Sequence, residues 1–271
     1  MIITFIGGGN MATAMIAGLV RRGHPADALR VVEVAAQARE KLQRDFAVSV
    51  FSEPGPALRG SNMVVLAVKP QQMRAVAGSV RPLLDRHVLI SIAAGIRSDD
   101  LARWLGGYER IIRAMPNTPA LVGAGVSALF ARPGVAADEK EAAQGVLQSV
   151  GAAHWLDREE DMDAVTAVSG SGPAYVFYFL EALQQAALEL GLPPALARSL
   201  SLETFRGASK LAVESEEDPA TLRARVTSKG GTTEAALAVM ETQQVKQRII
   251  TAVRAAAARS SELGDALGET D

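Results

Sequence analysis

The chain has 271 residues, of which 48% are hydrophobic, and its formal net charge at pH 7 is -2. This length favours about two domains at roughly 150 residues each, and the near-neutral charge gives no reason to expect a nucleic-acid partner. The absence of cysteine excludes disulfides and thiolate chemistry, and no apolar run approaches the roughly 20 residues that a membrane span needs.

The N-terminus predicts a buried strand that turns at once into glycines. Residues 2–6 are apolar, three glycines follow, and a helical pattern then runs to Gly23. This order fits the G-x-G-x-x-A dinucleotide fingerprint between a strand and a helix. Gly7 would permit the tight turn, Gly9 would let a pyrophosphate approach the helix N-terminus, and Ala12 would allow close packing. Because the chain opens in a strand without a basic leader, we expect a cytoplasmic protein.

Strand-like runs alternate with helical patterns through the first half of the chain. Such alternation predicts a Rossmann-like, doubly wound, mostly parallel α/β sheet. We therefore expect a dinucleotide-binding domain over residues 1–160. The expected strands are residues 2–6, 29–34, 48–51, 63–68, 88–92, 110–114 and 126–130.

Glu33, near the end of the second expected strand, bears on the choice of cofactor. It lies 24 residues after Gly9 (33 − 9), close to the spacing of about 20 at which a carboxylate accepts hydrogen bonds from the adenosine ribose and repels a 2′-phosphate. Arg39 could instead contact that phosphate, although an exposed helical arginine is the simpler interpretation. NADH is therefore expected to serve, and NADPH stays open.

Three later strands end in turn-forming or charged residues. Ligands of such sheets bind at the carboxyl ends of the strands, so these loops should surround the cofactor, although any one of them could be an ordinary turn. The loops are Ala67-Val68-Lys69-Pro70, Ser91-Ile92-Ala93-Ala94-Gly95 and Met115-Pro116-Asn117-Thr118-Pro119.

The second half of the chain reads as helical. Residues 174–180 are apolar all round, which predicts burial on every side. A half-chain of only about 110 residues can hardly enclose such a helix, so a partner subunit is the simplest cover, and an aromatic cofactor site is less favoured. The expected helices are residues 172–190, 193–213, 219–226, 232–241 and 245–263.

The usual catalytic bases of dehydrogenases are missing. No lysine occurs between Lys140 and Lys210, and no tyrosine has a lysine four residues on. The three histidines lack metal-like spacing, so we expect no metal site. An alcohol dehydrogenase needs a strong acid or base. A reductase of a protonated C=N bond needs only hydride geometry, a carboxylate anchor and a hydroxyl donor.

The stretch that begins at Ser228 can supply both the carboxylate anchor and the hydroxyl donor. Gly230 and Gly231 precede an expected helix, whose first N–H groups are unpaired donors in a positive field. With the hydroxyls of Ser228, Thr232 and Thr233 beside them, these glycines predict an anion site. A simple threonine-capped helix start is the alternative.

Taken together, these motifs resemble the pyrroline-5-carboxylate reductase family nearly from end to end. The resemblance includes Phe5-Ile6-Gly7-Gly8-Gly9-Asn10-Met11, the three strand-end loops, residues 169–175 and residues 222–241. It implies NAD(P)H-dependent reduction of 1-pyrroline-5-carboxylate to L-proline, the last step of proline biosynthesis. It also implies an all-helical substrate-binding and dimerisation domain over residues 161–271, with homodimers that assemble further into a decamer.

The resemblance assigns a role to individual residues. Gly230, Gly231 and Thr232 would bind the substrate carboxylate through backbone amides. Thr233 would hydrogen-bond the ring nitrogen, with Ser228 nearby as a second catalytic hydroxyl. The cofactor, NADPH or NADH, would be bound by Gly7, Gly9, Asn10, Met11, Glu33, Ala67, Val68, Lys69, Pro70, Asn117 and Thr118.

Two residues depart from the family pattern. Lys229 stands where proline is usual and could loosen the loop or add charge, and Ala224 stands where an acidic residue is common. Three alternatives stay open: a β-hydroxyacid reductase, which the missing lysine disfavours; a reductase of another cyclic imine such as piperideine-6-carboxylate; and a non-catalytic nucleotide-sensing subunit. Feedback by proline is equally open.

Overall fold

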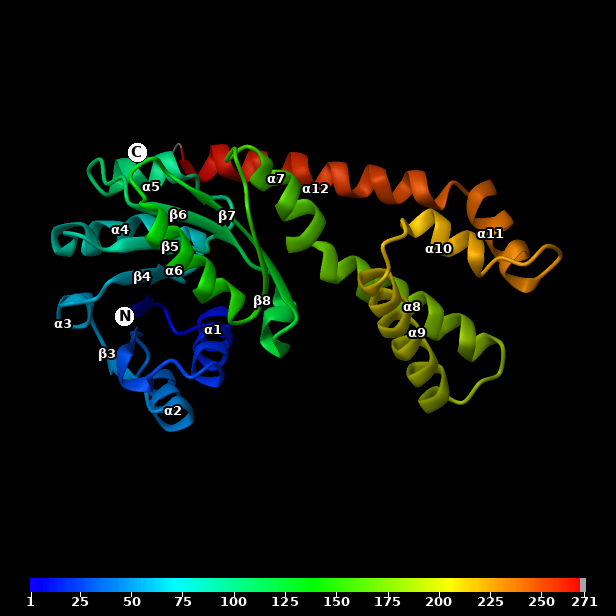
Figure 1. Cartoon of the computed structure of the whole chain (residues 1–271), viewed down its shortest axis with the longest axis horizontal. Coiled ribbons are helices and arrows are strands. Elements are labelled where there is room, and N and C mark those ends of the chain that lie inside the picture. Colours follow the sequence, from blue (N-terminus) through cyan, green and yellow to red (C-terminus); the bar gives the residue numbers. More distant parts are fainter. Residues whose placement is uncertain (269–271) are drawn as a thin grey trace. The chain divides into compact units, whose positions relative to one another are not determined.

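The computed structural model describes residues 1–268 and contains two compact units (Figure 1). The first unit comprises residues 1–171 together with the C-terminal part of the chain from Ala256, and the second comprises residues 172–255. No helix within residues 1–268 is both long and apolar enough to cross a membrane.

The first unit is built on one sheet of eight strands. The strands are β1 (Ile3–Ile6), β2 (Leu29–Val32), β3 (Ser49–Phe51), β4 (Met63–Leu66), β5 (Val88–Ser91), β6 (Ile111–Met115), β7 (Gly125–Ala131) and β8 (Gly151–Trp155). Their order is β3-β2-β1-β4-β5-β6-β7-β8, and only β6 and β7 are antiparallel. This confirms the mostly parallel, doubly wound sheet. The order reverses between β1 and β4, so a ligand is expected at the carboxyl ends of these strands.

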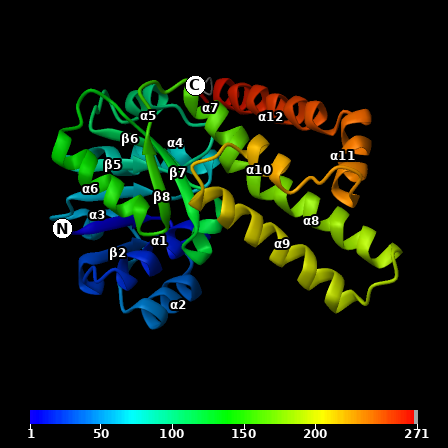
Figure 2. The ribbon, with the colours of Figure 1, turned by 45° about the vertical axis from the view of Figure 1, so that its right-hand side comes forward.

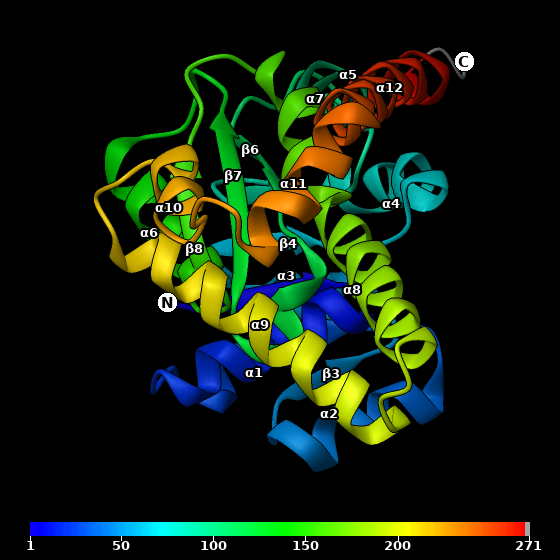
Figure 3. The same ribbon diagram turned by 90° about the vertical axis from the view of Figure 1, so that its right-hand side faces the viewer.

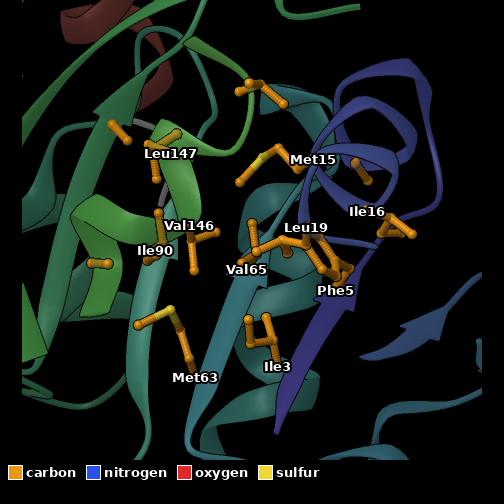
Figure 4. Packing of buried hydrophobic residues seen from close by; sticks show 14 of the residues in the cluster. Ile3, Phe5, Met15, Ile16, Leu19, Met63, Val65, Ile90, Val146 and Leu147 are labelled. Carbon is orange, nitrogen blue, oxygen red and sulfur yellow. The ribbon is translucent and has the colours of Figure 1, made fainter. Parts of the chain in front are cut away.

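Helices cover both faces of the sheet. They are α1 (Asn10–Arg21), α2 (Ala36–Phe46), α3 (Pro54–Leu58), α4 (Met73–Val80), α5 (Ser98–Trp104), α6 (Ala137–Gln148) and α7 (Asp161–Val165), and a π-helical turn (Thr166–Gly170) follows. One buried cluster joins Ile3 and Phe5 of β1 to Met15 of α1 and Leu147 of α6 (Figure 4). The opposite face packs on α3, α4 and α5. Alternate strand residues therefore point into two separate cores, as period-two geometry requires.

Two expected strands are too long by two residues at their carboxyl ends. Residues 29–34 and 63–68 were expected as strands, but β2 ends at Val32 and β4 ends at Leu66. The side chain of Val34 is 85% exposed. An apolar residue that lines a cleft cannot be distinguished by sequence pattern from one that continues a buried strand.

The second unit is helical, as expected. Its elements are α8 (Gly172–Glu189), α9 (Pro194–Glu214), α10 (Pro219–Arg225), α11 (Thr232–Thr242) and the beginning of α12 (Val245–Gly268). α8 and α9 form a helical hairpin (Figure 2), and α10, α11 and α12 follow in orange to red (Figure 3). On α8, the side chains of Val176, Phe177 and Tyr178 are 42%, 60% and 72% exposed. A single chain therefore leaves part of the apolar stretch uncovered.

Candidate functional site

The glycine loop between β1 and α1 is shaped by two different constraints. Gly7 has a φ of +99°, and a Cβ there would lie 2.7 Å from the backbone oxygen of Ala67, so only glycine fits. Gly9 is the N-cap of α1 with an extended backbone, and a Cβ there would meet no atom within 4 Å. No side chain within the described residues caps α1, so its first N–H groups face open space beside Gly9. The loop thus leaves room for an anion at Gly9.

Glu33 lies one residue beyond β2 and is held by backbone donors. Its Oε2 accepts from the Gly8 nitrogen at 3.0 Å, and its Oε1 accepts from the Ala35 nitrogen at 3.0 Å. Arg39 lies at the same rim, because its Nη1 donates to the backbone oxygens of Glu33 at 2.6 Å and Val34 at 2.8 Å. The two side chains considered as ribose contacts from the sequence, Glu33 and Arg39, therefore lie together just beyond the carboxyl end of β2.

A cleft of about 600 Å³ opens along the carboxyl ends of β1, β2 and β4. Six of the predicted cofactor residues line it: Gly7, Gly9, Glu33, Ala67, Val68 and Lys69. A further wall was not predicted, because it comes from the 3₁₀ turn Pro70–Gln72 and from the length of α4 and carries no motif. That wall includes Gln71, Gln72, Ala75, Val76 and Ser79.

The other five predicted cofactor residues lie outside the lining of this cleft. Asn10 and Met11 begin α1, and Pro70 begins a 3₁₀ turn after β4. Thr118 is exposed and begins a second 3₁₀ turn after β6. The side chain of Asn117 is buried: its Oδ1 accepts from the Val126 nitrogen at 2.9 Å, and its Nδ2 donates to the Ser169 oxygen at 3.1 Å. Asn117 thus ties the loop after β6 to the π-helical turn.

The glycine pair of the second unit stands at the start of α11. Gly230 has a φ of +73°, and Gly231 is an extended N-cap whose nitrogen donates to the Ser228 oxygen at 3.0 Å. No side chain caps α11 in the described part of the chain, so the first N–H groups of the helix have no partner within it. The Gly230 nitrogen donates to Oε2 of Glu234 at 2.6 Å. A carboxylate therefore already binds this loop in the free chain, a contact that was not predicted.

The hydroxyl groups beside this loop are available to a ligand. Ser228 and Thr232 are exposed and Thr233 is half-buried. None of these three hydroxyls has a hydrogen-bond partner among residues 1–268. The preceding helix α10 is fixed by Asp218, whose pKa is lowered by hydrogen bonds from the backbone and hydroxyl of Thr221. The loop between α10 and α11 thus carries hydroxyl groups without protein partners and follows a helix whose N-terminus is capped.

The N-termini of α1 and α11 and the hydroxyls beside α11 offer ligands mainly backbone amides and hydroxyl groups. Within residues 1–268, no group of histidine, aspartate or glutamate side chains is arranged to hold a metal ion. An arrangement of this kind can bind and orient anions but supplies no strong base.

Comparisons with known proteins point to one family. Residues 159–263 match a model described as pyrroline-5-carboxylate reductase dimerisation, and residues 2–95 match one described as NADP oxidoreductase, coenzyme F420-dependent. The chain is 44% identical to a pyrroline-5-carboxylate reductase of Pseudomonas aeruginosa over 98% of both chains.

Solved structures agree with this result. A pyrroline-5-carboxylate reductase from Coxiella burnetii matches with a TM-score of 0.92 and 38% identity, over 96% of this chain and 97% of that chain. A pyrroline carboxylate reductase from Plasmodium falciparum, with NADP bound, matches with a TM-score of 0.87 and 30% identity, over 97% and 98% of the two chains.

Proposed function

Because the chain belongs to the pyrroline-5-carboxylate reductase family, we propose that it reduces 1-pyrroline-5-carboxylate to L-proline with NAD(P)H, the last step of proline biosynthesis. The observation that carries this proposal is the uncapped start of α11, where Gly230 already holds a carboxylate. Residues 1–160 would act as the dinucleotide-binding domain, and residues 161–271 as the substrate-binding and dimerisation domain. The cytoplasmic location expected from the sequence stays a prediction.

The cofactor would bind in the cleft of the first unit. Its pyrophosphate would lie on the N-terminus of α1 at Gly9, where a side chain is absent and N–H groups are free. Its adenosine ribose would meet Glu33, and Lys69 at the rim would balance the phosphate charge. The Plasmodium falciparum relative with NADP bound supports this class of cofactor. Asn10, Met11, Ala67, Val68, Pro70, Asn117 and Thr118 are proposed as further contacts.

The substrate carboxylate would bind at Gly230, Gly231 and Thr232. These residues present backbone amides at a helix N-terminus, where the helix dipole favours negative charge. The hydrogen bond from the Gly230 nitrogen to the Glu234 carboxylate supports this proposal, because it demonstrates that a backbone amide of the loop can bind a carboxylate. Lys229 is exposed beside this position and adds a positive charge.

The chemistry then needs little from the protein beyond orientation. When bound, NAD(P)H would supply the hydride that adds to the imine carbon of the ring, which is C2 in pyrroline numbering. The electrons of the C=N double bond would pass to the protonated ring nitrogen, which becomes the amine of proline. Thr233 would hold or protonate that nitrogen, with the Ser228 hydroxyl nearby. Fixing reactants in attack geometry can contribute roughly 7–11 kcal/mol, which is why such a site works without a lysine or histidine base.

A direct assay tests this function. NAD(P)H oxidation that depends on added 1-pyrroline-5-carboxylate is expected, with proline as the product. Faster turnover of piperideine-6-carboxylate would assign a different cyclic imine. Cofactor binding with no turnover of any imine would indicate a nucleotide-sensing subunit instead.

The Glu33 carboxylate predicts a cofactor preference. NADH is expected to be used at least comparably to NADPH, because a carboxylate facing a 2′-phosphate repels it. Glu33→Ser should shift the ratio of kcat/KM values toward NADPH by roughly tenfold, about 1.4 kcal/mol. Glu33→Gln is the closer variant, because it removes the charge and keeps one acceptor oxygen for the Gly8 nitrogen, at the loss of the hydrogen bond from the Ala35 nitrogen. A hundredfold NADPH preference in the wild type that neither variant changes would show that Glu33 does not face the ribose.

The exposed apolar side chains of α8 support an obligate homodimer, and we propose that such dimers assemble further into a decamer. Phe177 is 60% exposed in the single chain, so Phe177→Asp would place a charge in the interface. We expect this variant to be insoluble or dissociated, and Gln37→Asp, on the exposed side of α2 in the first unit, to assemble normally. Analytical ultracentrifugation checks both. A stable, active wild-type monomer at low concentration would contradict the dimer.

A further inference from the structure

We propose that the C-terminal end of α12 is a positioning element for the loop after β5, and that Leu267 and Asp265 thereby act on the nicotinamide half of the cofactor. The inference rests on the proposed function only in taking NAD(P)H as the ligand of the cleft. It assigns a role to a part of the chain that lies outside every predicted motif.

The loop after β5 is placed to meet the nicotinamide end. In the sheet, β2 lies beside β1, β1 beside β4, and β4 beside β5, with Leu66 of β4 paired to Ser91 of β5. A dinucleotide whose ribose is at Glu33 and whose pyrophosphate is at Gly9 must extend from β2 across β1 toward β4 and β5. Residues 92–97, which follow β5, are therefore the next backbone that its nicotinamide reaches.

The end of α12 packs directly against this loop. Gly95 has a φ of +76°, and a Cβ there would lie 3.1 Å from Cδ1 of Leu267. Arg97 lies over Gly264 and pairs through its Nη2 with Oδ1 of Asp265 at 2.7 Å. Arg97 thus has its pKa raised, chiefly by its hydrogen bond to Asp265. The loop is held to the helix by Leu267 beside Gly95, by the Arg97–Asp265 ion pair and by a hydrogen bond of 3.5 Å from Nη2 of Arg97 to the Ser261 oxygen.

The end of α12 is itself anchored in the first unit. Ser260, which is buried, donates to Oδ1 of Asp163 of α7 at 2.6 Å. Nη2 of Arg103 of α5 donates to the Gly268 oxygen at 2.7 Å and so satisfies the C-terminus of α12. The end of α12 lies beside α5 in Figure 1. Leu267 packs onto the same core as α4 and α5. The helix end is therefore a fixed support and not a loose tail.

The far end of the loop is held by a second, independent contact. The Ser98 nitrogen donates to Oε1 of Glu159 at 2.7 Å, and Oε1 also pairs with Nη1 of Arg113 at 2.9 Å. Glu159 thus accepts a hydrogen bond from the first backbone nitrogen of α5. Its partner Arg113 is almost fully buried. With this end fixed, removing the contacts of α12 should shift only the part of the loop near Gly95.

Leu267→Ala tests the proposal, with Leu83→Ala as its matched control. Both leucines are half-buried and pack against the same core cluster, but Leu83 precedes β5 and Leu267 lies at the loop that follows it. We expect Leu267→Ala to lower kcat or raise the KM for NAD(P)H by about tenfold, since small misplacements of reacting groups are costly. Its affinity for ADP-ribose, which lacks the nicotinamide, should change by less than about twofold. Leu83→Ala should lose similar thermal stability and keep wild-type kinetics.

The milder Asp265→Asn variant keeps the test decisive should Leu267→Ala fold poorly. It changes one exposed side chain and should show the same split between NAD(P)H and ADP-ribose at a smaller size, about twofold to fivefold in kcat/KM. Equal losses for both ligands, or wild-type kinetics in both variants, would overturn the positioning role. A wild-type protein that binds ADP-ribose but never oxidises NAD(P)H would instead refute the proposed function.

Discussion

Gly9→Val is expected to abolish cofactor binding while leaving the fold intact. The backbone of Gly9 is extended, with φ -69° and ψ -176°, a conformation that valine adopts readily. A Cβ there meets no atom within 4 Å, so the added side chain clashes with nothing in the free protein. It would instead fill the space that a pyrophosphate needs at the N-terminus of α1. We expect the dissociation constant of NAD(P)H to rise at least roughly a hundredfold, about 2.7 kcal/mol.

Substitutions at two further glycines serve as a control and as a contrast to Gly9→Val. Gly145→Val, on the exposed side of α6, also adds a side chain into open space and should bind cofactor normally. Gly7→Val should differ from both, because its φ of +99° and the 2.7 Å approach to the Ala67 oxygen make the fold itself strained. Calorimetric titration with NAD(P)H, beside thermal melting curves, separates the three. Normal NAD(P)H binding by Gly9→Val would mean that the pyrophosphate lies elsewhere.

The sheet and the helices could be predicted because each rests on local signals. Period-two and period-3.6 patterns, with glycine and proline at the boundaries, place most elements within a few residues. The strand order was not predicted, because the pairing of strands depends on contacts between segments that are far apart in the sequence. The π-helical turn at Thr166–Gly170 had no such signal, because its stabilising contact from Asn117 comes from a loop far away in the sequence.

Residues of the candidate site could be predicted from the sequence only where they belong to a recognisable motif. The glycines and Glu33 were predicted, yet the bond from the Gly8 nitrogen to the Glu33 carboxylate depends on how β1 and β2 align. The cleft wall on α4 has ordinary polar and apolar residues whose position only the fold reveals. The return of α12 to the first unit was likewise hidden, since its exposed and buried residues read as any amphipathic helix.

Thr233→Val is expected to lower kcat/KM for the imine by about tenfold to a thousandfold. Valine keeps the shape of threonine and removes only the hydroxyl, which has no hydrogen-bond partner among the described residues and is half-buried. The reacting ring nitrogen would lose its donor in the transition state. NAD(P)H affinity should be nearly unchanged, because Gly7 and Gly9 lie in the other compact unit.

Gly231→Val should fail in a different way. A Cβ at Gly231 would lie 3.0 Å from the Ser228 oxygen, so a larger side chain pushes the loop and crowds the carboxylate off its amide donors. We expect the KM for the imine to rise roughly tenfold or more with a smaller fall in kcat, the pattern of lost ground-state binding.

Thr242→Val, at the end of the same helix, is the matched control for removing a threonine hydroxyl. Its hydroxyl donates to the Ala238 oxygen at 2.8 Å within α11, so its loss should leave steady-state kinetics at the wild-type level. Measuring kcat and KM for the imine and for NAD(P)H in all three variants separates proton donation from carboxylate binding. Wild-type kinetics in Thr233→Val would mean that the proton comes from water or from the substrate, and that the role assigned to Thr233 is wrong.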